Sequence, residues 1–133
     1  MPHRILIAQH LAKLFSVLSH PARIRILTEL RNGPLCVNSL QEVIGISHSG
    51  VSQHLSIMRA QGIIKETREG RHVYYRLTNQ EISDWLAEAI PFIVPDDSDS
   101  KLLVRAAQTT MEKWSDGKVK IKNNGRDKKA GSI

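Results

Sequence analysis

The side chains best suited to recognition chemistry lie close together between residues 47 and 58. Val51, Leu55 and Met58 recur at the spacing of one buried helix face, so the polar residues before and between them are predicted to face solvent. These outward residues are short, polar and uncharged at neutral pH: His48, Ser49, Gly50, Ser52, Gln53, His54 and Ser56. Glutamine can bond bidentately to adenine, serine can bond several base edges, and small residues let a helix N-terminus approach a phosphate backbone. The pattern favours base recognition, although an isolated polar helix face is more often simply solvated.

A basic hairpin is predicted directly after this helix. Residues 63–68 and 71–77 are two runs rich in Ile, Val, Tyr and Thr, and they are joined through Glu69 and Gly70. The hairpin has two acidic residues, Glu66 and Glu69. They are outnumbered by four basic residues: Lys65, Arg68, Arg71 and Arg76. Arg71 stands at the predicted tip, where a guanidinium reaches phosphates or the minor groove. Basic hairpins are often only soluble edges, so the combination with the polar helix is the informative part.

Two helices are predicted before residue 32. The first has one buried face, because apolar residues recur at helical spacing at Ile5, Ala8, Leu11, Leu14, Phe15 and Leu18. Residues 19–21 end it, and Pro21 suits the first turn of a second helix. The apolar face of that second helix is predicted to be Ile24, Leu27 and Leu30.

A short third helix is predicted between residues 38 and 45. Asn38 and Gln41 have the spacing of a capping box, and Gly45 closes the helix. Its apolar residues are Leu40, Val43 and Ile44. Ser47 is then a good N-cap for the polar helix, which follows after a turn of only a few residues.

A long apolar stripe is predicted on a helix after the hairpin. Thr78 and Glu81 form a second capping box, and Pro95 ends the helix. The stripe consists of Ile82, Trp85, Leu86, Ala89, Ile90 and Ile93. Residues 96–100 read as an acidic, serine-rich linker. Residues 101–114 could form one more amphipathic helix, through Leu102, Leu103, Ala106 and Trp114.

Composition limits the class of protein. The length of 133 residues suits about one domain, predicted to span residues 1–95, and residues 96–133 are expected to form a linker and a basic, partly disordered tail. The net charge of +6 favours a polyanionic partner. One cysteine excludes an intramolecular disulfide, and the start of the chain lacks the apolar run of a signal peptide or membrane span. The expectation is a cytoplasmic protein with no membrane partner.

The predicted order of elements is that of a winged helix-turn-helix, a mainly α fold with a β-hairpin wing, in which the second helix of the pair enters the major groove. Three motifs occur in this order: LSHPARIRIL at residues 18–27, ISHSGVSQHL at 46–55 and REGRHVYYRL at 68–77. Through them the chain resembles the ArsR/SmtB family of bacterial transcriptional repressors over residues 8–94. The resemblance implies a homodimer built from the first and last helices, which binds double-stranded DNA at an imperfect palindrome and releases it when an inducer binds.

The resemblance also assigns the DNA contacts by motif position. His48, Ser49, Ser52 and Gln53 are the candidates for reading bases, and Ser47 is the cap. His54 and Arg71 are expected on the DNA backbone. Gly50 and Arg68 complete the predicted DNA-binding set.

Many members of this family sense metals, but their two familiar sites are incomplete here. Residues 78–93 contain Glu81, Asp84 and Glu88 but no histidine, and these carboxylates suit the wet face of a helix. In residues 35–39 the first thiol of the family's cysteine pair remains as Cys36, and Asn38 stands where the second would be. We therefore predict no metal and no cofactor, and a mixed site built from His3, His10, His20 and Cys36 is disfavoured because its spacing matches no compact motif.

Cys36 has two interpretations of about equal weight. It is either a small, partly buried apolar residue, or a redox sensor whose thiolate is favoured by a nearby helix N-terminus. The sequence thus predicts a dimeric, DNA-binding repressor and not an enzyme, with a small inducer or an oxidant as its effector. A metal-responsive repressor with a non-standard site, a constitutive regulator and a protein-binding winged helix remain alternatives.

Overall fold

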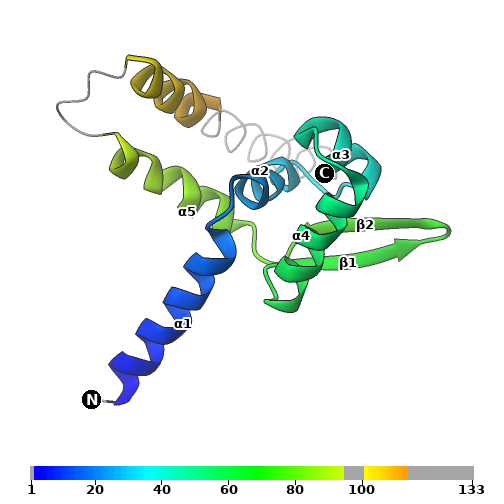
Figure 1. Cartoon of the computed structure of the whole chain (residues 1–133), viewed down its shortest axis with the longest axis horizontal. Helices are drawn as coiled ribbons and strands as arrows, with labels where there is room; N and C mark the ends of the chain where they lie inside the picture. Colours follow the sequence, from blue (N-terminus) through cyan, green and yellow to red (C-terminus); the bar gives the residue numbers. More distant parts are fainter. Residues whose placement is uncertain (1, 95–100, 114–133) are drawn as a thin grey trace, which may run out of the picture. The chain divides into compact units, whose positions relative to one another are not determined.

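The computed structural model describes residues 2–94 and 101–113. Its contacts divide the chain into two compact units, residues 1–80 and residues 81–133. In the described part of the first unit, four helices precede a β-hairpin (Figure 1). The helices are α1 (Pro2–Leu18), α2 (Pro21–Leu30), α3 (Val37–Ile44) and α4 (His48–Ala60). This is the predicted order, and the predicted domain boundary at residues 95–96 stays a prediction.

The break between α1 and α2 is built from the residues that the sequence indicated. His20 is the N-cap of α2, and its Nδ1 accepts a hydrogen bond from the backbone N–H of Ala22 at 3.1 Å. Pro21 occupies the first position of α2, where a missing N–H costs nothing because it has no helical partner. The chain therefore turns sharply between the two helices.

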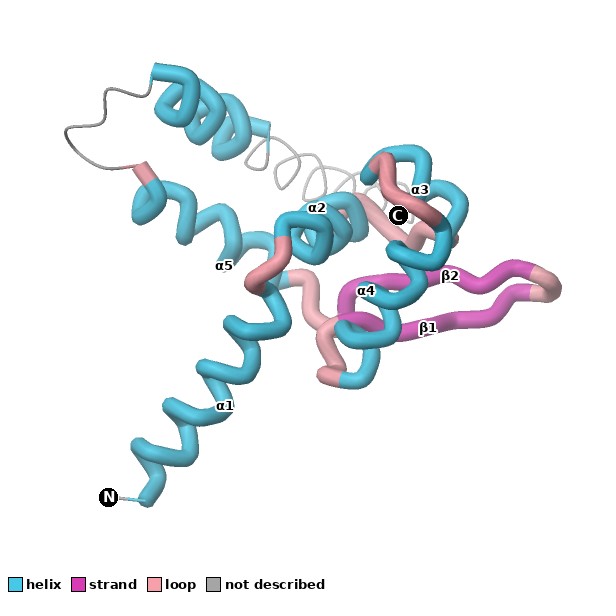
Figure 2. The backbone as a smooth tube through the Cα atoms, viewed as in Figure 1, coloured by secondary structure: helices cyan, strands magenta, loops and turns pink. Residues whose placement is uncertain are grey.

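The hairpin consists of β1 (Ile64–Glu69) and β2 (His72–Leu77), which pair antiparallel from Ile64 opposite Leu77 to Glu69 opposite His72. Gly70 and Arg71 form its two-residue turn, and Gly70 has a φ of +63°, which suits the first central position of a type II′ turn. Leu35 adds a third backbone segment, since it exchanges two hydrogen bonds with Tyr75. Figure 2 shows the hairpin projecting beyond α4.

The core of the first unit joins α2, α3, α4 and the base of the hairpin. Its fully buried side chains come from all four, and they are Ile26, Leu27, Leu30, Leu40, Val51, Leu55, Met58 and Ile64. The predicted core face of α4 is confirmed. On α2 the prediction of Ile24 is wrong, because the helix turns Ala22 and Ile26 inward and leaves Ile24 at the surface. On α3, the helix turns Leu40 and Ile44 inward and leaves Val43 exposed, so the prediction of Val43 on the apolar face is also wrong.

The apolar face of α1 is not buried within the chain. Only its last turn enters the core, through Val17 and Leu18. Large side chains further up the helix are about half exposed or more, at Ile5, Leu6, Ile7, Leu11 and Phe15. The periodicity correctly predicted a helix, but it contains no information about what packs against the apolar side of that helix.

The start of α3 differs from the prediction. Cys36 occupies the N-cap position, and the helix begins at Val37, so Asn38 lies inside the first turn and is not the cap. A thiol is a weak hydrogen-bond acceptor, and the Cys36 side chain makes no capping hydrogen bond. The Leu35–Tyr75 backbone pairing holds the preceding residue, so this helix start is set by the hairpin and not by a capping box.

The second unit contains α5 (Glu81–Ala89) and a short 3₁₀ helix, η1 (Ile90–Ile93). The helix begins two residues later than a Thr78 cap predicts. It also ends before the predicted Pro95, because Pro91 lacks the N–H that an α-helical turn requires. The predicted stripe is not continuous: Ile90 is buried, whereas Trp85, Ala89 and Ile93 are exposed.

A further helix covers residues 101–113, close to the predicted 101–114. Its buried residue is Ala107, whereas Leu102 and Ala106, predicted on the apolar face, are exposed. Trp114 and the predicted mobile tail lie outside the described residues. Among the described helices, none is long and apolar enough to span a bilayer.

Candidate nucleic-acid interface

The turn between α3 and α4 holds the polar helix at a defined angle. Gly45 adopts a left-handed conformation with φ of +78°, and its N–H donates to the carbonyl of Gln41 at 2.8 Å. The guanidinium of Arg25 on α2 donates to the carbonyls of Val43 at 2.9 Å and Ile44 at 3.1 Å. The unsatisfied carbonyls at the end of α3 are thus capped by a cation, which also suits the helix dipole.

The N-terminus of α4 is capped as the sequence predicts. The hydroxyl of Ser47 accepts a hydrogen bond from the N–H of Gly50 at 3.1 Å. A Cβ atom at Gly50 would lie only 3.1 Å from that same hydroxyl oxygen. Gly50 therefore protects the cap, which is a local reason for glycine at a position that we expected to serve close approach to a phosphate.

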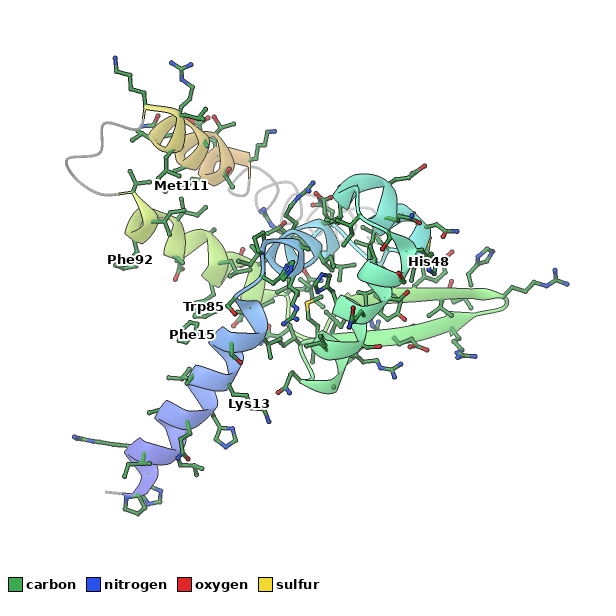
Figure 3. All side chains as sticks on the ribbon, viewed as in Figure 1. Lys13, Phe15, His48, Trp85, Phe92 and Met111 are labelled. Atoms are coloured by element: carbon green, nitrogen blue, oxygen red, sulfur yellow. The ribbon has the colours of Figure 1, made fainter. Side chains whose placement is uncertain are left out.

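The outward side of α4 presents neutral polar groups. His48, Ser49 and Gln53 are exposed, and Ser52 and Gly50 are half-buried. Figure 3 shows His48 at the start of α4, turned away from the helical core. The structure thus brings five of the predicted base-reading and backbone-approach residues onto one accessible helix start. Their amide, hydroxyl and imidazole groups can both donate and accept hydrogen bonds.

His54 does not belong to this outward set. It is half-buried, and its Nδ1 accepts a hydrogen bond from Nε of Arg23 on α2 at 3.1 Å. Its ring lies 4.4 Å from that of His20, centroid to centroid. Burial lowers the pKa of His54, and the nearby charges of His20 and Arg23 lower it further. The predicted contact of His54 with the DNA backbone is not supported by this position.

The wing carries Arg71 at its tip, Arg68 on one face, and Lys65 and Arg76 on the other face. Arg71 is exposed in the turn, and the side chain of Arg68 is 77% exposed. Arg68 contacts the Glu66 carboxylate at 3.5 Å, so it is lightly held and can turn to another anion. An exposed guanidinium on the wing can bind a phosphate, which agrees with the predicted roles of Arg68 and Arg71.

Glu66 links the wing to the end of α4, a connection that the sequence analysis missed. Its carboxylate accepts hydrogen bonds from Arg59 on α4 and from the hydroxyl of Tyr75 on β2. Burial raises the pKa of the Tyr75 hydroxyl, and the negative charge of Glu66 raises it further. The only available signal was a pair of opposite charges on either side of the Gly62 turn, which is too common to be specific.

Cys36 lies at the start of α3 and not on α4, next to Leu35, whose backbone pairs with the wing. Its Sγ is 3.3 Å from the Ser39 hydroxyl. This hydrogen bond, assisted by backbone N–H groups at the start of α3, lowers the pKa of the thiol against the opposing effect of burial. The preceding residue, Leu35, is the one that pairs with Tyr75 of the wing.

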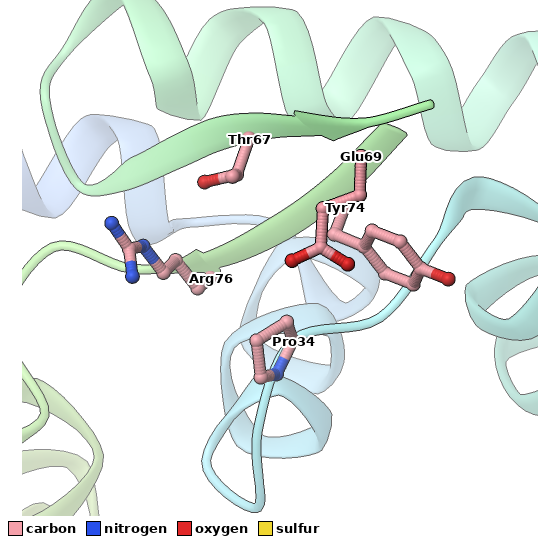
Figure 4. Close-up of a pocket in the computed structure, with 5 residues that line it drawn as sticks. All are labelled: Pro34, Thr67, Glu69, Tyr74 and Arg76. Atoms are coloured by element: carbon pink, nitrogen blue, oxygen red, sulfur yellow. The ribbon is translucent and has the colours of Figure 1, made fainter. Parts of the chain in front are cut away.

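A hollow of about 290 Å³ lies on the face of the hairpin opposite to Glu66 and Tyr75 (Figure 4). Alternating residues of both strands line it together with the loop before α3, and they are Pro34, Thr67, Glu69, Tyr74 and Arg76. Across residues 2–94 and 101–113, no three His, Cys, Asp or Glu side chains gather in a way that could hold a metal ion.

The helix pair, the wing and the neutral polar helix start define a winged helix-turn-helix of the DNA-binding class. Comparison with known proteins supports this assignment. The family model described as "Bacterial regulatory protein, arsR family" matches residues 20–66. The HTH-type transcriptional regulator NmtR of Mycobacterium tuberculosis is 41% identical over 83 residues, which cover 62% of this chain and 69% of that protein.

Two further proteins are similar. The transcriptional repressor SmtB homolog of Synechocystis is 36% identical over 68% of each chain. A solved homodimeric winged helix-turn-helix DNA-binding domain from Mycobacterium bovis has the same fold, with a TM-score of 0.60 at 21% identity, over 67% of this chain and 82% of that one. The chain belongs to the ArsR/SmtB family of winged-helix transcriptional repressors, so both the fold class and the family predicted from the sequence are confirmed.

Proposed function

We propose that this DNA-binding repressor acts as a homodimer that places α4 of each subunit in the major groove of a palindromic operator. The observation that carries the proposal is the capped start of α4, where exposed neutral hydrogen-bonding groups stand clear of the core. A face without charge gains little from phosphates in general, so its binding energy depends on which bases it meets.

The residues divide into two roles. His48, Ser49, Ser52 and Gln53 read base edges, and Gly50 with the Ser47 cap keeps the helix start compact. Arg68 and Arg71 on the wing bind the DNA backbone or the adjacent minor groove. The first group supplies sequence preference and the second supplies affinity that does not depend on sequence.

The exposed apolar side of α1 supports the homodimer. Ile5, Ile7, Leu11 and Phe15 are 47–62% exposed, and so large an apolar surface on one helix is typical of an interface. A second copy of the chain, related by a twofold axis, would cover it and present two copies of α4. The half-sites are then expected about 34 Å apart, one turn of DNA.

The test begins with selection of DNA fragments by the purified protein. We expect Gln53→Ala to lose about 1–3 kcal/mol on the selected operator and to relax the preference at one base position. Arg71→Ala should weaken binding to operator and scrambled DNA alike, and should reduce the slope of affinity against salt by about 1. Equal losses on both DNAs from both variants would overturn the assignment of roles.

Cys36 is the proposed effector site, and an oxidant is the proposed effector. Its thiolate attacks one oxygen of hydrogen peroxide, an S–O bond forms, the O–O bond breaks, and hydroxide leaves to become water. The sulfur is oxidised to a sulfenic acid and the peroxide is reduced. Because Cys36 follows the Leu35 segment that pairs with Tyr75, a larger polar group there would disturb the attachment of the wing.

Operator affinity before and after peroxide tests this proposal, with mass spectrometry to confirm the modification. The wild-type protein should lose affinity on oxidation and regain it with a thiol reductant. Cys36→Ser should bind equally under both conditions. If the oxidised wild-type protein binds as tightly as the reduced one, Cys36 is a packing residue and not a sensor.

A further inference from the structure

A cluster of two histidines and one arginine joins three helices behind the DNA-reading face. Arg23, on the first turn of α2, donates from Nε to His54 of α4 at 3.1 Å and from its terminal nitrogen to the carbonyl of Val17, at the end of α1, at 3.0 Å. The His20 ring lies against the His54 ring at a tilt of 51°. One guanidinium thus ties the end of α1 to the middle of α4.

The hydrogen bonds determine where the imidazole protons lie. His54 accepts at Nδ1 from Arg23, and His20 accepts at Nδ1 from the N–H of Ala22. A neutral histidine has one donor and one acceptor nitrogen, so each ring carries its proton on Nε2. A second proton on His54 can only go to Nδ1. It would place an N–H and a positive charge opposite the guanidinium, and the contact would have to open.

We propose that Arg23 and His54 are positioning residues for DNA recognition, which hold α4 at the angle needed to read the operator and release it when His54 takes up a proton. This inference rests on the proposed function of α4. It gives His54 a role different from the DNA-backbone contact expected from the sequence. Neither residue needs to touch DNA.

The charges around His54 all act in the same direction. The ionisable groups that act on it among the described residues are His20, at the junction of α1 and α2, and Arg23, on α2; no carboxylate is among them. Burial lowers the pKa of His54 most, and electrostatic interaction with His20 and with the Arg23 guanidinium lowers it further. The Arg23–His54 contact is therefore intact above the ordinary histidine pKa of about 6.5 and is lost as the pH falls through the lowered value.

The test measures operator affinity between pH 8 and pH 5.5 at constant ionic strength. His54→Asn keeps an acceptor near the position of Nδ1 but does not titrate, and His54→Ala removes the acceptor. His10→Asn, on the exposed part of α1, is the matched control. The wild type and the control should lose affinity by at most about tenfold per pH unit for each linked proton.

The variants separate positioning from simple stability. His54→Asn should bind within about twofold of the wild type at pH 8 and lose less affinity at low pH, whereas His54→Ala and Arg23→Ala should bind several-fold more weakly at pH 8. The wild type and His54→Asn share every other histidine, so the difference between their pH profiles isolates His54.

Two results would contradict these expectations, and they can be told apart. If His54→Asn shows the same pH profile as the wild type, the pair is not a proton-linked positioning device. If the wild type shows no preference for operator over scrambled DNA at pH 8, the proposed function of α4 fails, and the role of the pair in recognition fails with it.

Discussion

Two histidines on the same helix show how much depends on the surroundings of a single residue. His48 and His54 are six positions apart on α4. His48 is exposed at the helix start, whereas His54 is half-buried and accepts a hydrogen bond from Arg23. Both were predicted to face solvent because neither shares the apolar positions of α4, and the family resemblance then placed both on DNA. The partner that turns His54 inward comes from a helix about thirty residues earlier, and helical periodicity contains no information about it.

Cys36 provides a prediction at this scale. The Ser39 hydroxyl is the main cause of the lowered pKa of the thiol, so Ser39→Ala should raise that pKa. Below the pKa, the thiolate fraction falls about tenfold for each unit of increase, and alkylation by iodoacetamide at pH 7 should slow accordingly. The rate as a function of pH, followed by mass spectrometry, measures the change.

Asn38→Ala is the matched control for this measurement. Asn38 influences the thiol through its backbone alone, so loss of its side chain should leave the pKa where it is. Equal alkylation rates in Ser39→Ala and the wild type would show that the Ser39 contact does not stabilise the thiolate.

At the scale of elements, local signals determined the central part of the fold. The Ser47 cap, the apolar positions of α4, the Gly45 turn and the Gly70 hairpin were all visible in the sequence and are present in the structure. One error arises where another element decides, because the Leu35–Tyr75 pairing sets the start of α3. The other error is local: Pro91, inside the predicted apolar stripe, ends α5 early.

The Ser47 cap gives a prediction for this scale. Ser47→Ala leaves the N–H of Gly50 without its side-chain acceptor and should lower the free energy of unfolding by about 1 kcal/mol. Urea denaturation, followed by circular dichroism, measures it. Ser56→Ala, exposed on the same helix, should be neutral or stabilising by a few tenths of a kcal/mol, because alanine has the higher helix propensity. If the two variants are equally stable, the cap contributes nothing.

At the scale of the whole molecule, the apolar side of α1 and the distribution of charge matter most. The net charge is +6, but residues 1–95 account for only half of it, with ten basic and seven acidic groups. The basic excess of residues 101–133 therefore suits sequence-independent attraction to phosphates, which agrees with the proposal that selectivity comes from α4.

The proposed dimer is tested through α1. Leu11 is 47% exposed in the single chain, so Leu11→Glu should barely affect the fold of one subunit. It would place a charge in the proposed interface, and sedimentation equilibrium should show a shift from dimer to monomer. Lys13→Glu, which places the same side chain on the opposite side of α1, should leave the dimer intact. A Leu11→Glu protein that stays dimeric would exclude this face as the interface.

The sequence by itself determined the order of the elements, the polar face of α4, the basic wing tip and the family. These depend on periodicity, caps and turn residues, which act over a few positions along the chain. The tertiary structure decided which polar side chains of α4 are exposed and which are held by another element. Contacts such as Arg23–His54 and Arg59–Glu66 depend on how separate elements pack, so the surroundings of each side chain follow from burial and from its partner.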